Sequence, residues 1–302
     1  MKSIARYLTA IGVAALLMHS AIAADPGGPP PQILPEGIRG GSEVVPEPTV
    51  EIRKYVFRET GEELPYSVFV SSKIRKGQKA PLVIALRGFT GTTLTFVRGT
   101  AVDLAEAGGY ILVGAIGYNN RAGFGVQGGP RPGATPGAAP AAATPAAARP
   151  QPPMVGGTKE TDPALVTQYS EKDVMNVLAL VRKEFNIDDR RIYLMGHSQG
   201  GGGARHLAEK YPDTWAAVAL LAPALFNVQV TAESRITKVP LLLAVGDKDS
   251  LMASSRAFSE QLRGLGVGHE YIEKPGLDHG TIIMGAMPDV FRFFPKHVKP
   301  AH

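Results

Sequence analysis

The sequence predicts an α/β fold: a mostly parallel central sheet flanked by helices on both faces, with an antiparallel hairpin at the N-terminus of the domain. Continuous apolar runs without a polar face recur along the chain, and segments with helical periodicity lie between them. Such runs are typical of strands buried on both faces, and strands that alternate with helices form parallel sheets through right-handed crossovers. The 302 residues fit one large domain of this class.

The first expected element is the antiparallel hairpin. Residues 50–59 (VEIRKYVFRE) and 64–72 (LPYSVFVSS) alternate apolar and polar side chains, and the short polar segment TGEE separates them. Alternation with a period of two indicates half-buried strands, and a short polar connection indicates that the two strands pair.

Five continuous apolar runs follow the hairpin: PLVIAL, YILVGAIG, RIYLMG, WAAVALLA and PLLLAVG. A further strand-like run follows His269. Helical patterns lie between these runs, at residues 93–107, 170–185, 201–211 and 254–265. Because ligands bind outside the carboxyl ends of the strands in open α/β sheets, the residues after each run are the first candidates for a functional site.

The N-terminus resembles a secretory signal peptide. Lys2 and Arg6 precede an apolar stretch, and the tripeptide AIA fits a cleavage site after Ala23. The apolar stretch is shorter than the roughly 20 residues that span a bilayer. We therefore expect an exported protein, periplasmic or secreted, with a signal peptide at 1–23 and no membrane segment after its cleavage.

Two segments do not follow the strand and helix pattern. Residues 24–48 are rich in proline and glycine and lack periodicity, so we expect a disordered leader before a domain at 49–302. Residues 121–157 form an insertion rich in alanine, proline and glycine, with too few large apolar side chains to pack. We expect this insertion to be mobile and to lie on the active-site side of the sheet. For such a composition a tolerated surface insertion is commoner than a functional lid.

The composition excludes several classes of function. The chain has no cysteine, so no thiol can be the nucleophile and no disulfide can support the fold. It has 32 Lys and Arg residues against 27 Asp and Glu, and loss of the signal peptide would reduce the formal net charge from +5 to about +3. Because the basic residues are interspersed with acidic ones, we expect no nucleic-acid partner.

The most informative motif is GHSQG at residues 196–200, which matches G-x-S-x-G where a buried strand gives way to a helix. In this context a strained turn lifts a serine above the sheet. The glycines do not match a phosphate-binding loop or the G-x-G-x-x-G spacing of a dinucleotide site. We interpret them as steric clearance around Ser198, and the further glycines at 201–203 suggest close packing of the helix start.

A serine nucleophile needs a base and a carboxylate that orients the base. Both appear later in the chain, each after a strand: Asp249 in LLLAVGDKDS and His279 in GLDHG. Asp249 fits a turn after the strand better than Asp247, which we expect to cap that turn, but the choice between them stays open. We expect Asp278, beside the histidine, to shape its loop.

Backbone N–H groups near the serine would bind a developing oxyanion. We expect one from Gln199 at the helix N-terminus and another from Phe89 or Thr90 in the loop LRGFTGTT after PLVIAL. A plain left-handed turn at the glycines of this loop is the alternative. Aromatic side chains near strand ends could line an acyl pocket, and Tyr118 and Phe226 are the candidate substrate-binding residues.

From about Pro81 to its end, the chain resembles the α/β-hydrolase superfamily. Residues 186–224 (NIDDRRIYLMGHSQGGGGARHLAEKYPDTWAAVALLAPA) are similar to the polyhydroxybutyrate depolymerase and feruloyl or acetyl-xylan esterase-like group. They are also similar to related hydrolases of the prolyl oligopeptidase type.

The resemblance implies a serine esterase with Ser198 as nucleophile, Asp249 as acid and His279 as base, without a metal or cofactor. The sequence departs from the family in two places. Members usually carry His-Gly where this chain has Arg87-Gly88, and the insertion replaces a better-structured loop.

We therefore expect an exported hydrolase that cleaves small-molecule or polysaccharide-linked esters through an acyl-enzyme. One alternative keeps the same three residues in a serine peptidase of the prolyl oligopeptidase type. Another is a catalytically silent binding module of the same fold, with Arg87 as the sign of an inactive oxyanion loop. The sequence predicts neither the oligomeric state nor the acyl and alcohol groups of the substrate.

Overall fold

The structure is a computed structural model that describes residues 49–127, 152–226 and 228–301. The predicted signal peptide, the predicted leader and most of the predicted insertion lie outside these ranges.

One sheet organises the described residues. Its strands are β1 (Val50–Phe57), β2 (Glu62–Val70), β3 (Ala80–Leu86), β4 (Ile111–Ala115), β5 (Ile187–His197), β6 (Ala217–Leu221), β7 (Leu241–Gly246) and β8 (His269–Lys274). They lie in the order β1-β2-β4-β3-β5-β6-β7-β8. β1 pairs antiparallel with β2 and β2 with β4, whereas all other pairs are parallel. The predicted hairpin and mostly parallel sheet are therefore confirmed.

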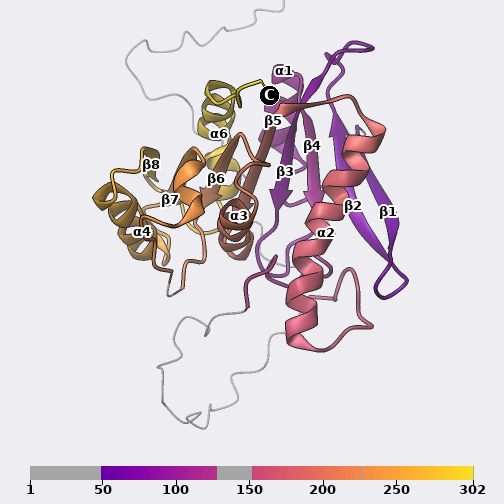
Figure 1. The fold of residues 1–302 in the computed structure, drawn as a ribbon, viewed down its shortest axis with the longest axis horizontal. Helices are drawn as coiled ribbons and strands as arrows, with labels where there is room; N and C mark the ends of the chain where they lie inside the picture. The colour runs from indigo at the N-terminus through magenta and orange to yellow at the C-terminus, as the bar shows by residue number, and fades with distance from the viewer. Residues whose placement is uncertain (1–48, 128–151, 227, 302) are drawn as a thin grey trace, which may run out of the picture. The chain divides into compact units, whose positions relative to one another are not determined.

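Helices cover both faces of this sheet. They are α1 (Gly99–Gly108), α2 (Pro163–Glu184), α3 (Gln199–Lys210), α4 (Met252–Gly264), α5 (Ile282–Gly285) and α6 (Met287–Phe293), with short 3₁₀ helices at Arg235–Lys238 and Phe294–Lys296. α2, α3 and α4 pack on one face, and α2 crosses in front of the strands in Figure 1. α1, α5 and α6 pack on the other. This coverage explains why β3, β4, β6 and β7 consist entirely of buried residues.

The starts of two helices differ from their predicted positions. The segment predicted as helical from residue 93 begins its helix only at Gly99, because the carbonyl of Thr93 accepts a hydrogen bond from Ser67 Oγ at 2.6 Å and residues 92–95 form a turn. α2 begins earlier than predicted, at Pro163. There Asp162 accepts hydrogen bonds from Ala164 N–H and Leu165 N–H as the N-cap, with proline as the first helical residue.

The two ends of the predicted insertion pack against the body of the domain. Asn119 and Gly156 form an antiparallel bridge. The side chain of Asn120 donates to Pro153 O at 3.0 Å and accepts from Val155 N–H at 3.1 Å. Residues 121–127 and 152–157 are therefore folded, and only the part between them falls outside the described residues.

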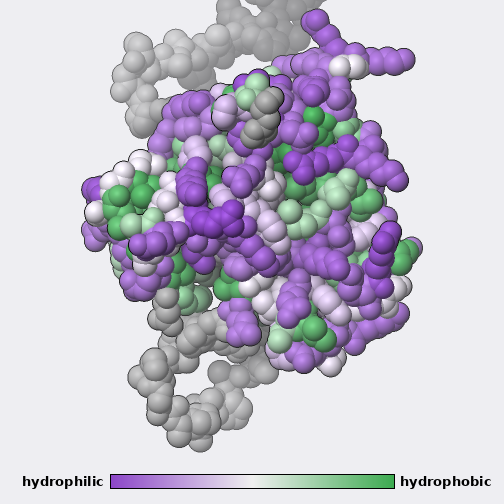
Figure 2. Space-filling view, in the orientation of Figure 1, coloured by the Kyte–Doolittle hydropathy of each residue, from purple (hydrophilic) through white to green (hydrophobic). Residues whose placement is uncertain are grey.

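The surface drawn in Figure 2 is mostly hydrophilic, with small apolar patches. Large apolar side chains that are exposed are spread along the chain: Ile52, Val56, Val70, Phe89, Met154, Phe226, Leu265 and Val298. Among the residues that the structure describes, none of the helices combines the length and apolar character required to span a bilayer.

Candidate active site

Ser198 is the single residue between β5 and α3, and its φ of 55° places it in the left-handed region. Its N–H donates to Leu221 O at 2.9 Å, and its carbonyl accepts from Gly202 N–H at 3.0 Å and from Ala224 N–H at 2.8 Å. A non-glycine residue held in such a region is strained by about 1–3 kcal/mol. The hydrogen bonds hold this strain at the strand-to-helix turn, which is the geometry of a nucleophile elbow.

The two glycines of the motif lie where no side chain fits. A Cβ on Gly196 would collide with the carbonyl of Gly200, and a Cβ on Gly200 would collide with the carbonyl oxygens of Leu86 and Arg87. The start of α3 therefore lies directly against the end of β3 and the loop that follows it.

The next three glycines also make close contacts. A Cβ on residues 201, 202 and 203 would lie 2.8 Å from Pro223 Cα, 2.6 Å from Ala224 O and 2.5 Å from Phe124 Cβ, respectively. Each glycine inside a helix costs about 1 kcal/mol relative to alanine. The predicted close packing of the helix start is thus confirmed, against backbone at residues 201 and 202 and against the Phe124 side chain at residue 203, and it explains why the sequence tolerates this cost.

Replacing Gly200 by alanine is expected to destabilise the protein by about 3 kcal/mol, because both colliding atoms belong to backbone that cannot move independently. Gly264→Ala is the matched control. It is also a helical glycine, but a Cβ there would meet nothing within 4 Å, so a gain of about 0.5 kcal/mol is expected. Urea unfolding of both variants measures the difference. Equal stabilities would contradict the packing argument.

The structure brings the predicted serine, histidine and aspartate into one chain of hydrogen bonds. His279 Nε2 lies 2.9 Å from Ser198 Oγ, and His279 Nδ1 lies 2.8 Å from Asp249 Oδ2. Asp249 follows β7 and His279 follows β8, so the three residues meet at the carboxyl ends of three strands. Asp249 is buried with 6% exposure, whereas the side chain of His279 remains accessible.

These contacts define the proton positions. A carboxylate can only accept, so His279 Nδ1 donates to Asp249 and the lone pair of Nε2 faces the serine hydroxyl. The second oxygen of Asp249 accepts from Leu251 N–H at 2.8 Å. Burial raises the pKa of Asp249, but the hydrogen bonds from His279 and Leu251 outweigh it, so the net pKa lies below its ordinary value. The arrangement keeps a charged carboxylate beside the His279 ring.

The two neighbouring aspartates have structural contacts. Asp247 is exposed, and its carboxylate accepts from Gly276 N–H at 2.8 Å, which ties the turn after β7 to the turn after β8. Asp278 Oδ1 accepts from Gly280 N–H and from both the N–H and the hydroxyl of Thr281. Asp278 therefore shapes the histidine loop, as the sequence predicts, whereas the Asp247 carboxylate bonds to the turn after β8 rather than to its own turn, which the sequence predicts it to cap.

His197 supports His279, a contact that sequence reasoning missed. Its Nε2 lies 2.7 Å from the backbone carbonyl of His279, so this nitrogen donates, and the two rings lie 4.5 Å apart. Burial, together with the nearby His279, lowers the pKa of His197 to about 3. A neutral His197 thus fixes the backbone at His279. Only the fold reveals this contact, because 82 residues separate the two.

The loop after β3 passes beside the serine. A Cβ on Gly88 would lie 3.4 Å from Ser198 Cβ and 2.9 Å from His197 Nδ1. Within the described ranges, neither Phe89 N–H nor Gln199 N–H donates to a protein acceptor, and both remain candidate oxyanion donors. The prediction that Thr90 N–H could bind an oxyanion is wrong. Its N–H donates to Asn120 O at 2.7 Å and is therefore not available to a substrate.

The two predicted pocket residues have different surroundings. Tyr118 is fully buried, packs against Phe57 and Tyr169, and donates its hydroxyl to Glu62 at 2.8 Å. Because its ring fills a separate small core, the prediction that Tyr118 binds substrate is wrong. Phe226 is 39% exposed on the loop after β6, whose Ala224 is bonded to Ser198. It remains a candidate.

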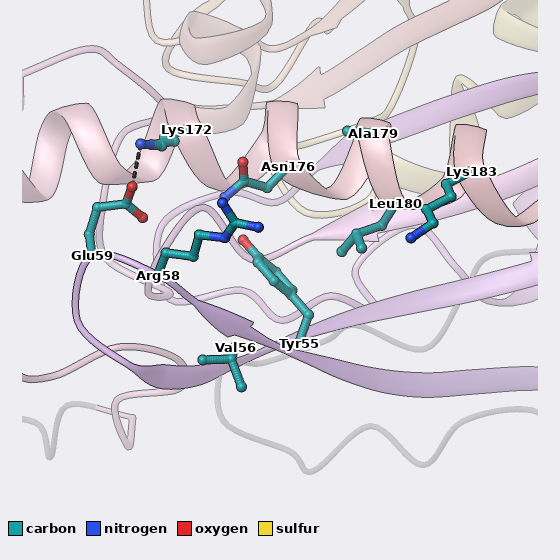
Figure 3. A pocket seen from close by; sticks show the side chains of 9 residues that line it. All are labelled: Tyr55, Val56, Arg58, Glu59, Lys172, Asn176, Ala179, Leu180 and Lys183. Carbon is teal, nitrogen blue, oxygen red and sulfur yellow. Dashed lines mark ion pairs between the residues drawn. The ribbon is translucent and has the colours of Figure 1, made fainter.

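A separate groove of about 580 Å³ lies between β1 with its turn and α2 (Figure 3). Its lining includes Arg58, Lys183 and the ion pair of Lys172 with Glu59, but none of the three hydrogen-bonded residues described above. Neither serine nor histidine is among the residues that line it. Over the ranges described, the structure has no group of three or more His, Asp or Glu residues that could hold a metal ion.

Comparisons with known proteins agree with this fold. Residues 164–232 match the model of a family described as serine aminopeptidase, S33. A search of curated proteins found no match.

Among solved structures, an S-formylglutathione hydrolase from Agrobacterium tumefaciens is 17% identical, with a TM-score of 0.57 over 83% of this chain and 95% of that one. A ferulic acid esterase from Anaeromyces mucronatus is 17% identical, with a TM-score of 0.56 over 87% and 95%. A thermostable esterase is 18% identical, with a TM-score of 0.54 over 83% of this chain, but the match spans only 64% of the esterase.

Proposed function

We propose that this chain, which has the fold of the α/β-hydrolase superfamily, is an exported serine hydrolase that cleaves carboxylic esters. The hydrogen-bonded series from Asp249 through His279 to Ser198 is the observation that carries the proposal. That the protein is exported is supported only by the sequence of residues 1–23, which resembles a signal peptide.

In the proposed reaction, Ser198 Oγ attacks the carbonyl carbon of the ester while His279 Nε2 takes the hydroxyl proton. The carbonyl oxygen becomes an oxyanion, which the N–H groups of Phe89 and Gln199 would bind. His279 then gives its proton to the departing alkoxide, and the acyl group stays on Ser198. Water attacks this acyl-enzyme with help from the same base, and the carboxylic acid leaves.

The surroundings of Ser198 favour an apolar acyl or aryl group of modest size. Phe89 is 50% exposed on the loop beside the serine, and Phe226 extends from the loop after β6. Met154 is 43% exposed, and its two neighbours in the chain hydrogen-bond to the side chain of Asn120. The carbonyl of Asn120 accepts from Thr90 N–H in the loop beside the serine. Exposed apolar side chains on loops around a nucleophile can bind the apolar part of a substrate.

Labelling with a fluorophosphonate tests the nucleophile. We expect the folded protein to incorporate one label, mapped by peptide mass spectrometry to Ser198. Ser254 is a suitable internal comparison, because its hydroxyl donates to Leu251 O and bonds to no histidine among the residues that the structure describes. A protein that stays unlabelled after prolonged exposure would instead be a silent binding module of this fold.

The family match described as a serine aminopeptidase supports a second candidate, a peptidase with the same three residues. Nitrophenyl esters of increasing acyl length, compared with aminoacyl nitroanilides, distinguish the two. We expect kcat/KM for the best ester to exceed that for any amide. Amide turnover above ester turnover would replace the esterase proposal with the peptidase.

A further inference from the structure

We propose, on the basis of the esterase function above, that Arg87 is a positioning residue for the oxyanion site. Its guanidinium holds the Gly88–Phe89 loop and the Gln199 end of α3 in the arrangement that binds the oxyanion. These two segments carry the candidate N–H donors, and the guanidinium bonds to both. The contacts of Arg87, its lack of free donors and its electrostatic partner each support this role.

Arg87 uses its whole hydrogen-bonding capacity inside the protein. The residue is 1% exposed, and each of its five N–H groups has an acceptor. Four of the bonds measure between 2.8 and 3.1 Å. The acceptors are Ile116 O, Gly88 O, Gln199 Oε1, Asn119 O and Ala122 O. With no donor left over and almost no exposure, the guanidinium is not a binding group for an anionic substrate.

The acceptors belong to the segments that surround Ser198. Gly88 O also accepts from Gly91 N–H, so the bond from Arg87 fixes the turn that contains Phe89. Gln199 uses both ends of its side chain, accepting from Arg87 and donating from Nε2 to Arg121 O at 3.0 Å. The guanidinium thereby joins the loop after β3, the loop after β4 and the first residue of α3.

Phe124 connects this arrangement to the glycine run. The guanidinium carbon of Arg87 lies 4.8 Å from the centre of the Phe124 ring, a cation–π distance. A Cβ on Gly203 would lie 2.5 Å from Phe124 Cβ. The last glycine of the run therefore makes room for the ring that stacks on Arg87.

A buried carboxylate compensates the buried cation. Arg87 Nε donates to Ile116 O at 2.9 Å, and Asp173 Oδ2 accepts from Gly117 N–H at 2.7 Å. The guanidinium thus binds the carbonyl, and the carboxylate binds the N–H, of the same peptide group between Ile116 and Gly117. Burial lowers the pKa of Arg87 to about 9, and Asp173 counteracts part of this shift, so the guanidinium stays protonated at neutral pH.

Substitution of Arg87 tests the proposal. Lysine has three donors for five acceptors and methionine has none, so both Arg87→Lys and Arg87→Met should loosen the oxyanion site. We expect kcat of Arg87→Met on a nitrophenyl ester to fall by about 100-fold, with KM changed less than about threefold, as for loss of one oxyanion donor. The affinity for an aryl trifluoromethyl ketone, whose adduct places an oxyanion in the site, should fall by the same factor as kcat/KM.

Arg53→Met is the matched control. Arg53 is also a hydrogen-bonded arginine beside a phenylalanine ring, but its partners Glu51 and Glu184 lie on β1 and α2. It should lower the thermal midpoint and leave kcat and ketone affinity unchanged. A purely structural Arg87 would behave like Arg53, so folded Arg87 variants with wild-type kcat and ketone affinity would overturn the proposal.

Gln199→Leu decides the outcome if the Arg87 variants do not fold. It removes one acceptor and leaves the guanidinium bonded to four carbonyls, so we expect a folded protein with kcat and ketone affinity each reduced about tenfold. Unchanged values in this variant would overturn the proposal. Measurements on the wild type distinguish failure of the Arg87 proposal from failure of the esterase proposal. A wild type without ester turnover and without label on Ser198 would overturn both proposals. An active wild type with unaffected variants would overturn only the role of Arg87.

Discussion

The Ser198→Ala variant is expected to lose about 10⁶-fold in kcat on esters while it keeps its fold. Alanine retains the Cβ and the backbone conformation, so the bonds from Ser198 N–H to Leu221 and from Gly202 and Ala224 to the Ser198 carbonyl remain. Only the hydroxyl that faces His279 Nε2 disappears. Steady-state kinetics on the best nitrophenyl ester, with circular dichroism as the check on folding, measures the loss.

Ser198→Gly provides a second check of the same turn. A glycine relieves the strain of a φ of 55°, although it also gives the unfolded chain more freedom. We expect the glycine variant to be inactive and more stable than the alanine variant by about 1 kcal/mol. Folded Ser198→Ala with more than about one per cent of wild-type kcat would rule out Ser198 as the nucleophile.

The sequence predicts the sheet well, because strands that are buried on both faces consist of continuous runs of apolar residues. β3 and β7 match the runs PLVIAL and PLLLAVG to within one residue, and β6 lies inside the run WAAVALLA. Once these runs are taken as parallel strands, their ends must meet at one edge. The meeting of Ser198, Asp249 and His279 is therefore predictable, since each follows a strand.

Local sequence patterns predict the first residue of a helix less well where tertiary contacts determine it. The start of α1 moves to Gly99 because a side chain from β2 takes the carbonyl of Thr93, a partner that no local pattern indicates. The start of α2 could have been placed from Asp162 and Pro163, an N-cap followed by a first-turn proline, but the composition of the preceding insertion obscures it.

The finer parts of the site could not be predicted for a similar reason. Thr90 and Phe89 are adjacent, and only the carbonyl of Asn120 decides which N–H is free. Tyr118 follows a strand as a pocket residue would, yet its positive φ of 64° accompanies a ring packed between Phe57 and Tyr169. Arg87 marks a departure in the sequence, but its five acceptors come from two loops and the first residue of α3, which meet only in the fold.

Asp249→Asn is expected to lower kcat by about 10⁴-fold, as loss of the acidic member of such a triad does elsewhere. The oxygen of asparagine can still accept from Leu251 N–H, so the amide nitrogen then faces His279 Nδ1. A donor there requires the proton to move to Nε2, which turns the lone pair away from Ser198. The expected defect is therefore a wrong tautomer in an intact site, with KM nearly unchanged.

Asp247→Asn is the matched control, two residues away in the same turn. Its carboxylate accepts one bond from Gly276 N–H, which an asparagine oxygen can also accept, so kcat should stay within about twofold of wild type. The pair also resolves the choice that the sequence leaves open, because the two aspartates follow the same strand. A large loss in Asp247→Asn with a small one in Asp249→Asn would mean that the hydrogen bond from His279 to Asp249 does not orient the base during turnover.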